Sequence, residues 1–156
     1  MNEPGLHRRV LVIGYGNPMR GDDGFGPHVA SLLAGQFDPD QATILTLQQL
    51  TPDLSERVAQ HELTILIDAQ RGDSPGTVHH RLIQPPDQAA HTFQHHITPE
   101  VLAGVTQALY GVQAAIHLIS VETDRFELGE ELSPAVSGAA VQEAVHLAVS
   151  YTHLTL

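Results

Sequence analysis

The residues best suited to chemistry lie in residues 14–27, GYGNPMRGDDGFGP, directly after the apolar run VLVI. Glycine-rich loops that follow a strand usually present backbone N–H donors to a phosphate group. This loop instead carries two adjacent acceptors, Asp22 and Asp23. A carboxylate at the end of a buried strand can cap the next helix, bind a cation or act as a general base.

A dinucleotide-binding function does not fit this loop. The Gly-x-Gly-x-x-Gly fingerprint needs a third glycine where the chain has Met19, and an acid after the second strand, which ends in LTLQQL. A pyrophosphate would also be repelled by Asp22 and Asp23. A structural function stays open, in which one of these aspartates only caps the following helix.

A second candidate carboxylate is Asp68, which closes the apolar run ILI in LTILIDAQ. In a doubly wound sheet with the usual strand order 2-1-3, the carboxyl ends of the first and third strands meet at the rim where ligands bind. Asp23 and Asp68 would then be close together, and each would raise the pKa of the other unless a cation bound between them. The alternative is that Asp68 is a loop acid that caps the next turn.

The third candidate ligand comes from FQHHITPEVL, which offers His95 and His96 before an expected helix. The chain has eleven histidines and a second adjacent pair at His79 and His80, so a histidine near the rim is weak support by itself. Two carboxylates and one imidazole suit a divalent ion such as Ni²⁺ or Zn²⁺, with positions left open for other ligands.

The elements that would position these residues alternate between short apolar runs and helical periods. The pattern predicts a single α/β domain over residues 1–156, with a three-layer arrangement in which helices cover both faces of a mostly parallel, twisted sheet of about five strands. Strands are expected at residues 9–14, 42–47, 63–68, 77–83 and 115–121. The first and third of these contain continuous apolar runs, which places them at the centre of the sheet.

Helices are expected between the strands. Three starts pair a hydroxyl N-cap with proline: Thr51-Pro52, Thr98-Pro99 and Ser133-Pro134. A helix over residues 25–34 should bury Val29, Leu32 and Leu33. Behind Ser133, apolar residues at helical spacing predict a face packed on the sheet (Ala140, Val141, Ala144, Val145, Ala148 and Val149), and the last residues, THLTL, are expected to fray.

Composition narrows the function further. Seven basic and eighteen acidic residues give a net charge of -11, which argues against nucleic acid as a partner. No apolar run could span a bilayer and the N-terminus does not resemble a signal peptide, so we expect no membrane partner and a cytoplasmic location. The absence of cysteine removes thiolate ligands and thiol nucleophiles. No Gly-x-Ser-x-Gly elbow is present, and HELTI lacks the second histidine of a zincin.

Taken in order, the motifs resemble those of the nickel-iron hydrogenase maturation endopeptidases. The opening loop is similar to the N-terminal signature of that family, and the resemblance continues through QQLTPDL, ILIDA, PGTV, HHITPEVL and LSPAV. It implies a peptidase that removes the C-terminal extension of the hydrogenase large-subunit precursor once nickel has been inserted. By motif, Asp23 and Asp68 would be catalytic, and Asp23, Asp68 and His95 would bind the metal. His95 is preferred to His96 because it places Leu102 at the apolar position of the family, seven residues on.

The resemblance also implies that the nickel is carried by the substrate and not by the enzyme, and that zinc or cadmium could occupy the same site. The glycines of the loop would let the precursor tail pass close to the backbone. Two other functions remain as alternatives. One is a nickel-binding module, such as a metallochaperone or sensor without peptidase activity. The other is a nucleotide-binding regulator.

Overall fold

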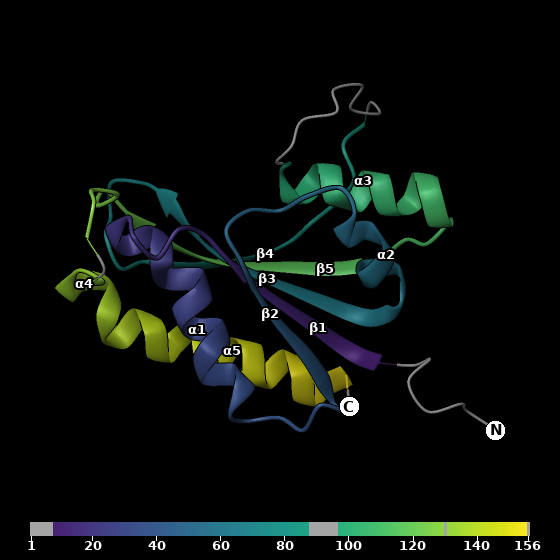
Figure 1. Cartoon of the computed structure of the whole chain (residues 1–156), viewed down its shortest axis with the longest axis horizontal. Helices are drawn as coiled ribbons and strands as arrows, with labels where there is room; N and C mark the ends of the chain where they lie inside the picture. Colours follow the sequence, from purple (N-terminus) through teal and green to yellow (C-terminus); the bar gives the residue numbers. More distant parts are fainter. Residues whose placement is uncertain (1–7, 88–96, 130, 156) are drawn as a thin grey trace.

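The computed structural model describes residues 8–87, 97–129 and 131–155, and these form one five-stranded sheet with helices on both faces (Figure 1). The strand order is β2-β1-β3-β5-β4. The strands are β1 (Arg8–Tyr15), β2 (Ala42–Leu47), β3 (His61–Arg71), β4 (Val78–Leu82) and β5 (Ala115–Thr123). All neighbours are parallel except β4 and β5, which are antiparallel. The predicted fold class and the neighbouring placement of the first and third strands are confirmed.

The helices form two layers. On one face lie α1 (Phe25–Ala34), α4 (Pro134–Ser137) and α5 (Ala139–Thr155), and on the other lie α2 (Leu54–Ala59) and α3 (Pro99–Tyr110), as Figure 1 shows. A short 3-10 helix, η1 (Gly21–Gly24), joins the loop after β1 to α1. Among the described residues, no helix is both long and apolar enough to cross a membrane.

The central strands are buried because both faces of the sheet are covered. In β3, Ile65 and Ile67 belong to the core under α1 and α5, whereas Leu66 belongs to the core under α2 and α3. This explains the continuous apolar run in place of an alternating pattern. The strand is longer than predicted, because its pairing with β5 continues to Arg71 opposite Thr123.

The predicted helix starts have three different outcomes. Thr98 caps α3 as expected, since its Oγ1 accepts the Val101 N–H at 3.2 Å. The start at Thr51 is wrong, because α2 begins at Leu54 after a turn. Ser133 precedes α4 as expected, but its hydroxyl donates to Asp22 and makes no capping bond to the helix.

Three details of the helices differ from the sequence prediction. Leu32 was expected in the core but is 45% exposed, because Val29 and Leu33 occupy the face of α1 that contacts the sheet. The helix behind Ser133 is divided into α4 and α5 at Gly138. The expected fraying of the last residues is wrong as far as Thr155, which is still helical.

Candidate active site

The candidate site lies at the carboxyl ends of β1 and β3, where α1 packs directly on the strands. A Cβ atom on Gly14 would lie 2.1 Å from the Gly26 carbonyl oxygen, and one on Gly26 would lie 2.2 Å from the Ile67 carbonyl oxygen. Only glycine permits this close approach of backbone to backbone. The prediction that these glycines border the path of a substrate is therefore wrong at Gly14 and Gly26, which face other parts of the chain.

Asp23 is held in place by the loop that carries it. Its Oδ2 accepts the backbone N–H of Asn17 at 2.7 Å, so the loop folds back onto the carboxylate. Gly16 makes this turn possible, because its φ is +141° and a Cβ there would lie 1.9 Å from the Asp23 carbonyl oxygen. Neither aspartate caps α1, whose N-cap is Gly24 and has no side-chain capping bond. The alternative that these acids serve only as helix caps is therefore wrong.

Asp68 is mostly buried at the end of β3 and points to the side of the sheet covered by α2 and α3. Burial raises the pKa of its carboxyl to about 7, and the nearby charge of Asp23 adds to the rise. Hydrogen bonds from the Ala69 N–H, at 2.7 Å, and from the Tyr15 hydroxyl oppose this rise. The two acids are thus near enough to affect each other, as the strand order predicts.

Tyr15 is a site residue that the sequence analysis did not identify. It is the last residue of β1, and its hydroxyl is hydrogen-bonded to Asp68. Burial raises the pKa of the hydroxyl well above its usual value, and the Asp68 charge adds to this effect. A polar aromatic residue at the end of an otherwise apolar buried strand was the feature that could have pointed to it.

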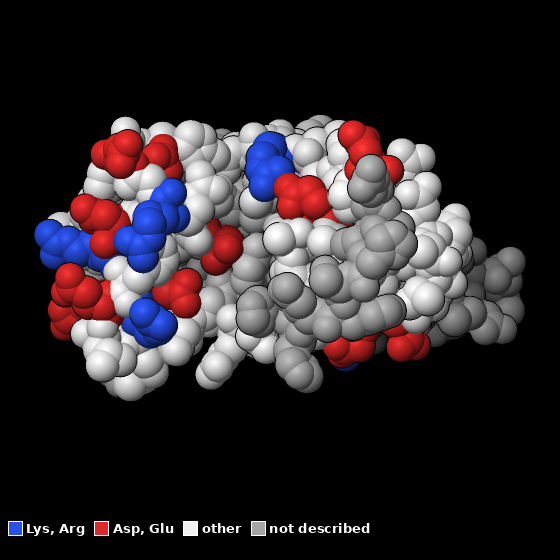
Figure 2. All heavy atoms as spheres, turned by 90° about the horizontal axis from the view of Figure 1, so that it is seen from above, with Lys and Arg blue, Asp and Glu red and all other residues white. Residues whose placement is uncertain are grey.

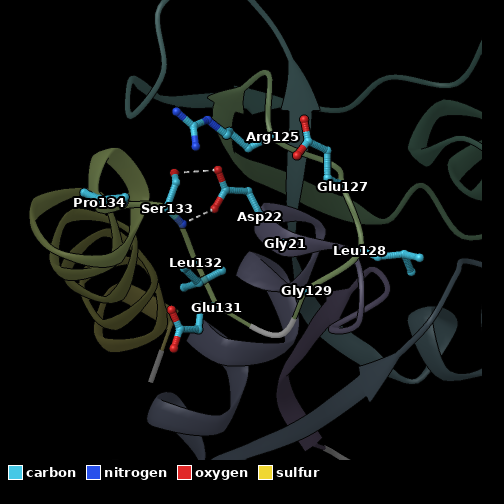
Figure 3. Close-up of a pocket in the computed structure, with 10 residues that line it drawn as sticks. All are labelled: Gly21, Asp22, Arg125, Glu127, Leu128, Gly129, Glu131, Leu132, Ser133 and Pro134. Carbon is cyan, nitrogen blue, oxygen red and sulfur yellow. Dashed lines mark hydrogen bonds between the residues drawn. The ribbon is translucent and has the colours of Figure 1, made fainter.

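Asp22, the neighbour of Asp23, has a different environment. It is fully buried and accepts a hydrogen bond from the Thr123 hydroxyl. It also accepts bonds from the Ser133 N–H and hydroxyl, at 2.6 and 2.7 Å, which Figure 3 shows. These bonds join η1 to the end of β5 and to the start of α4. Asp22 therefore holds the loop in position and is not available to a ligand.

A pocket of about 480 Å³ lies beside Asp22, between η1 and the segment that connects β5 to α4. Figure 3 shows that Ser133 and Asp22 point toward each other at this pocket, whereas Leu128 points away from them. The Asp22 carboxylate is already occupied by hydrogen bonds from the protein, and the pocket does not include Asp23 or Asp68 among its lining residues. We therefore place the candidate site at Asp23 and Asp68.

The predicted third ligand, His95, and its alternative His96 lie outside the described residues. Within residues 8–87, 97–129 and 131–155, no group of three or more His, Asp or Glu side chains could hold a metal ion. The second histidine pair has other contacts: His79 Nε2 is 2.6 Å from Glu122 Oε2, and His80 Nε2 is 2.7 Å from His117 Nδ1. The described part of the site thus supplies two carboxylates and a tyrosine hydroxyl.

The surface does not suggest a polyanionic ligand. On the face seen in Figure 2, the basic side chains are few and stand beside acidic ones. All basic residues of the chain are arginines, and two of the described ones, Arg9 and Arg81, form ion pairs with Glu62 and Glu100.

The comparison with known proteins found similar chains among the solved structures. No protein-family model matches the chain, and no curated protein matches it in sequence. A hydrogenase 2 maturation peptidase from Thaumarchaeota archaeon SCGC_AB-539-E09 has 27% identity and a TM-score of 0.71, covering 94% of this chain and 99% of the other. The NiFe hydrogenase maturation protease HybD from Thermococcus kodakarensis has 28% identity and a TM-score of 0.63, covering 92% and 99%. An endopeptidase from Escherichia coli has 25% identity and a TM-score of 0.66, covering 91% and 90%.

Several of the solved structures that this chain resembles are hydrogenase maturation proteases. The resemblance that the sequence motifs carry is thereby confirmed. The matched maturation proteases are peptidases, and the similarity extends over nearly the whole length of each chain. In this chain, the fold that they share places the glycine-rich acidic loop at the carboxyl ends of β1 and β3.

Proposed function

We propose that this protein is an endopeptidase that removes the C-terminal extension of a nickel-iron hydrogenase large-subunit precursor in the cytoplasm, after nickel has been inserted. The observation that carries the proposal is the meeting of Asp23 and Asp68 at one rim, in the fold of the hydrogenase maturation proteases. The ordered motifs from the opening loop to LSPAV support the same conclusion.

The proposed mechanism uses the nickel of the precursor as the recognition element. Asp23, Asp68 and His95 complete the coordination of an ion that the precursor already holds. Two neighbouring carboxylates, one of them mostly buried, favour a cation between them, because a cation removes their mutual repulsion. Zinc and cadmium are divalent ions that the same oxygen and nitrogen ligands can bind, so either can replace nickel as a probe of the site.

Within that complex, Asp23 and Asp68 are the proposed catalytic residues. A bound divalent ion polarises a peptide carbonyl and lowers the pKa of an attacking water, and a carboxylate at hydrogen-bond distance can accept its proton. The fixed hydrogen bonds of both side chains suit this task, because they hold the oxygens in place before the substrate arrives.

The test is the intact mass of the large-subunit precursor after incubation with this protein. We expect the loss of a C-terminal peptide from nickel-loaded precursor and no loss from nickel-free precursor. Asp23→Asn should prevent the loss, whereas the control Asp124→Asn, an exposed acid beyond the end of β5, should not. No cleavage of nickel-loaded precursor by the wild-type protein would contradict the proposal.

The same preparation separates the proposal from a nickel-binding module. Titration of the purified protein with Ni²⁺ should give at most weak binding at a single site, because the enzyme supplies only part of the coordination shell. Several tight sites, with no cleavage of nickel-loaded precursor, would favour a metallochaperone or sensor.

A further inference from the structure

A row of polar residues crosses the sheet on the side covered by α2 and α3, at the carboxyl ends of the parallel strands. Tyr15 of β1 is hydrogen-bonded to Asp68 of β3. Asp68 is paired in register with Ser120 of β5, and Ser120 is paired with His79 of β4. Residues paired in register point to the same face of a sheet, so His79 shares a face with Asp68.

The spacing within this row matches a short piece of extended peptide. Neighbouring strands are about 4.8 Å apart, so the backbones at Asp68 and His79, two strands apart, are separated by about 10 Å. An extended chain covers this distance in about three residues. Ser120, which lies between them, is buried, so the peptide would run outside it along the strand ends, presenting one bond to Asp68 and contacting His79 with a residue further along.

His79 is exposed but fixed. Its Nε2 lies 2.6 Å from Glu122 Oε2, and 46% of its side chain is exposed, against 18% for Glu122. The Glu122 carboxylate also accepts the backbone N–H groups of Asp73 and Ser74, and its pKa is lowered chiefly by the bond to His79. The loop between β3 and β4 packs directly against this carboxylate, since a Cβ on Gly72 would lie 2.2 Å from Glu122 Oε1. An exposed imidazole held by such a fixed carboxylate is preorganised for recognition.

The bond to Glu122 also determines which ring nitrogen of His79 carries a proton. Nε2–H donates to the carboxylate, which leaves Nδ1 of the neutral ring as an acceptor. The next residue, His80, points to the opposite face, where it contacts His117 and Tyr151. Of this histidine pair, only His79 shares a face with Asp68.

We propose that His79 is a specificity-determining residue that binds the tail of the precursor, about three residues from the peptide bond presented to Asp23 and Asp68. This inference rests on the peptidase function proposed above. The ligand is an extended peptide whose main-chain N–H donates to Nδ1 of His79. Glu122 is a positioning residue, which acts by holding the imidazole.

The first test compares kinetic constants for cleavage of nickel-loaded precursor. His79→Ala should raise KM about tenfold and change kcat less than twofold, because the contact is made equally in the bound substrate and in the transition state. Glu122→Gln should raise KM by a smaller factor. The double variant should be no worse than His79→Ala alone, because Glu122 acts through His79.

Two substitutions at His79 separate recognition from a structural function. The side-chain amide of asparagine lies near the position of Nδ1, whereas that of glutamine lies near the position of Nε2. His79→Asn should therefore recover part of the lost affinity, and His79→Gln should not. The matched control is His146→Ala, an exposed histidine on α5, which should leave KM unchanged.

The substrate provides the decisive control. With a precursor whose tail ends one residue after the cleaved bond, wild-type protein and His79→Ala should have the same KM. An unchanged KM for His79→Ala on the full tail would overturn the inference, as would a KM increase that persists on the shortened tail. Failure of the wild-type protein to cleave any precursor would instead contradict the proposed peptidase function.

Discussion

Asp22 and Asp23 are adjacent in the chain, yet the protein uses their carboxylates in different ways. Asp22 is fully buried and accepts three hydrogen bonds from Thr123 and Ser133. Asp23 is only partly buried, accepts a hydrogen bond from the Asn17 N–H, and lies near Asp68. The comparison shows that the burial and the hydrogen-bond donors around an acid, more than its place in a motif, separate a structural residue from a candidate ligand.

The largest expected effect is the loss of precursor cleavage when Asp23 is replaced. Asp23→Asn should lower the rate of precursor cleavage about 10³-fold, within the range typical of losing a catalytic acid or base. The midpoint of thermal unfolding should move by less than about 2 °C, because the side chain contributes little to the core. Mass spectrometry of the precursor over time, together with a thermal melt, measures both quantities. A variant that fails to fold would support a structural function for Asp23.

The reverse result is expected at Asp22. Asp22→Asn should lower the free energy of unfolding by about 2–4 kcal/mol, because the buried amide cannot accept all three hydrogen bonds. Urea unfolding of the variant and of the exposed control Asp124→Asn gives the difference. Equal stability of the two variants would contradict the structural function of Asp22.

A smaller loss is expected when one donor to Asp22 is removed. Thr123→Val should cost about 1–2 kcal/mol, because the carboxylate keeps both bonds from Ser133. In the Asp22→Asn background the same change should cost less, which a double-mutant cycle measures. Simple additivity would mean that Thr123 stabilises the fold through other contacts.

At neutral pH, the buried carboxyl of Asp68 should lower the stability of the metal-free protein. Its pKa rises from 3.8 to about 7 on folding, so the folded protein holds a proton that the unfolded chain releases. Stability from this group is therefore lost as the pH rises from about 4 to about 7. Asp68→Asn should raise the midpoint of thermal unfolding at pH 8, and raise it less at pH 5. A destabilised variant at both values would show that Asp68 supports the fold as Asp22 does.

The same contrast between paired and unpaired polar groups is found in the core. Thr64 is buried, and its Oγ1 has no hydrogen-bond partner among the described residues, whereas the Thr106 hydroxyl donates to the Leu102 carbonyl at 2.8 Å. Thr64→Val should stabilise the protein by up to about 1 kcal/mol, and Thr106→Val should not. Urea unfolding of the two variants tests this, and a loss of stability in both would contradict it.

The main features of the fold could be predicted from local patterns. Continuous apolar runs identified β1 and β3 as central strands, and the Thr98-Pro99 pair identified the start of α3. The strand order then placed Asp23 near Asp68. These predictions succeeded because burial on both faces and a hydroxyl before proline leave a direct mark on the sequence.

The features that the sequence analysis did not predict depend on contacts between segments that are distant in the chain. The function of Asp22 is determined by Thr123 and Ser133, which are more than 100 positions away, and no pattern in the loop indicates them. The bond between the Tyr15 hydroxyl and Asp68 likewise depends on the pairing of β1 with β3, and the close approach of Gly14 to Gly26 depends on how α1 packs on the strands. His95 lies outside the described residues, so its predicted function stays a prediction.

The most direct test of this account is a side-by-side measurement of Asp22→Asn and Asp23→Asn on nickel-loaded precursor, with each rate divided by the folded fraction from circular dichroism. We predict that folded Asp22→Asn retains a rate within about tenfold of the wild-type value, whereas fully folded Asp23→Asn loses about 10³-fold. Equal loss in both variants, or greater loss in Asp22→Asn, would contradict the assignment of Asp23 to the active site and of Asp22 to the fold.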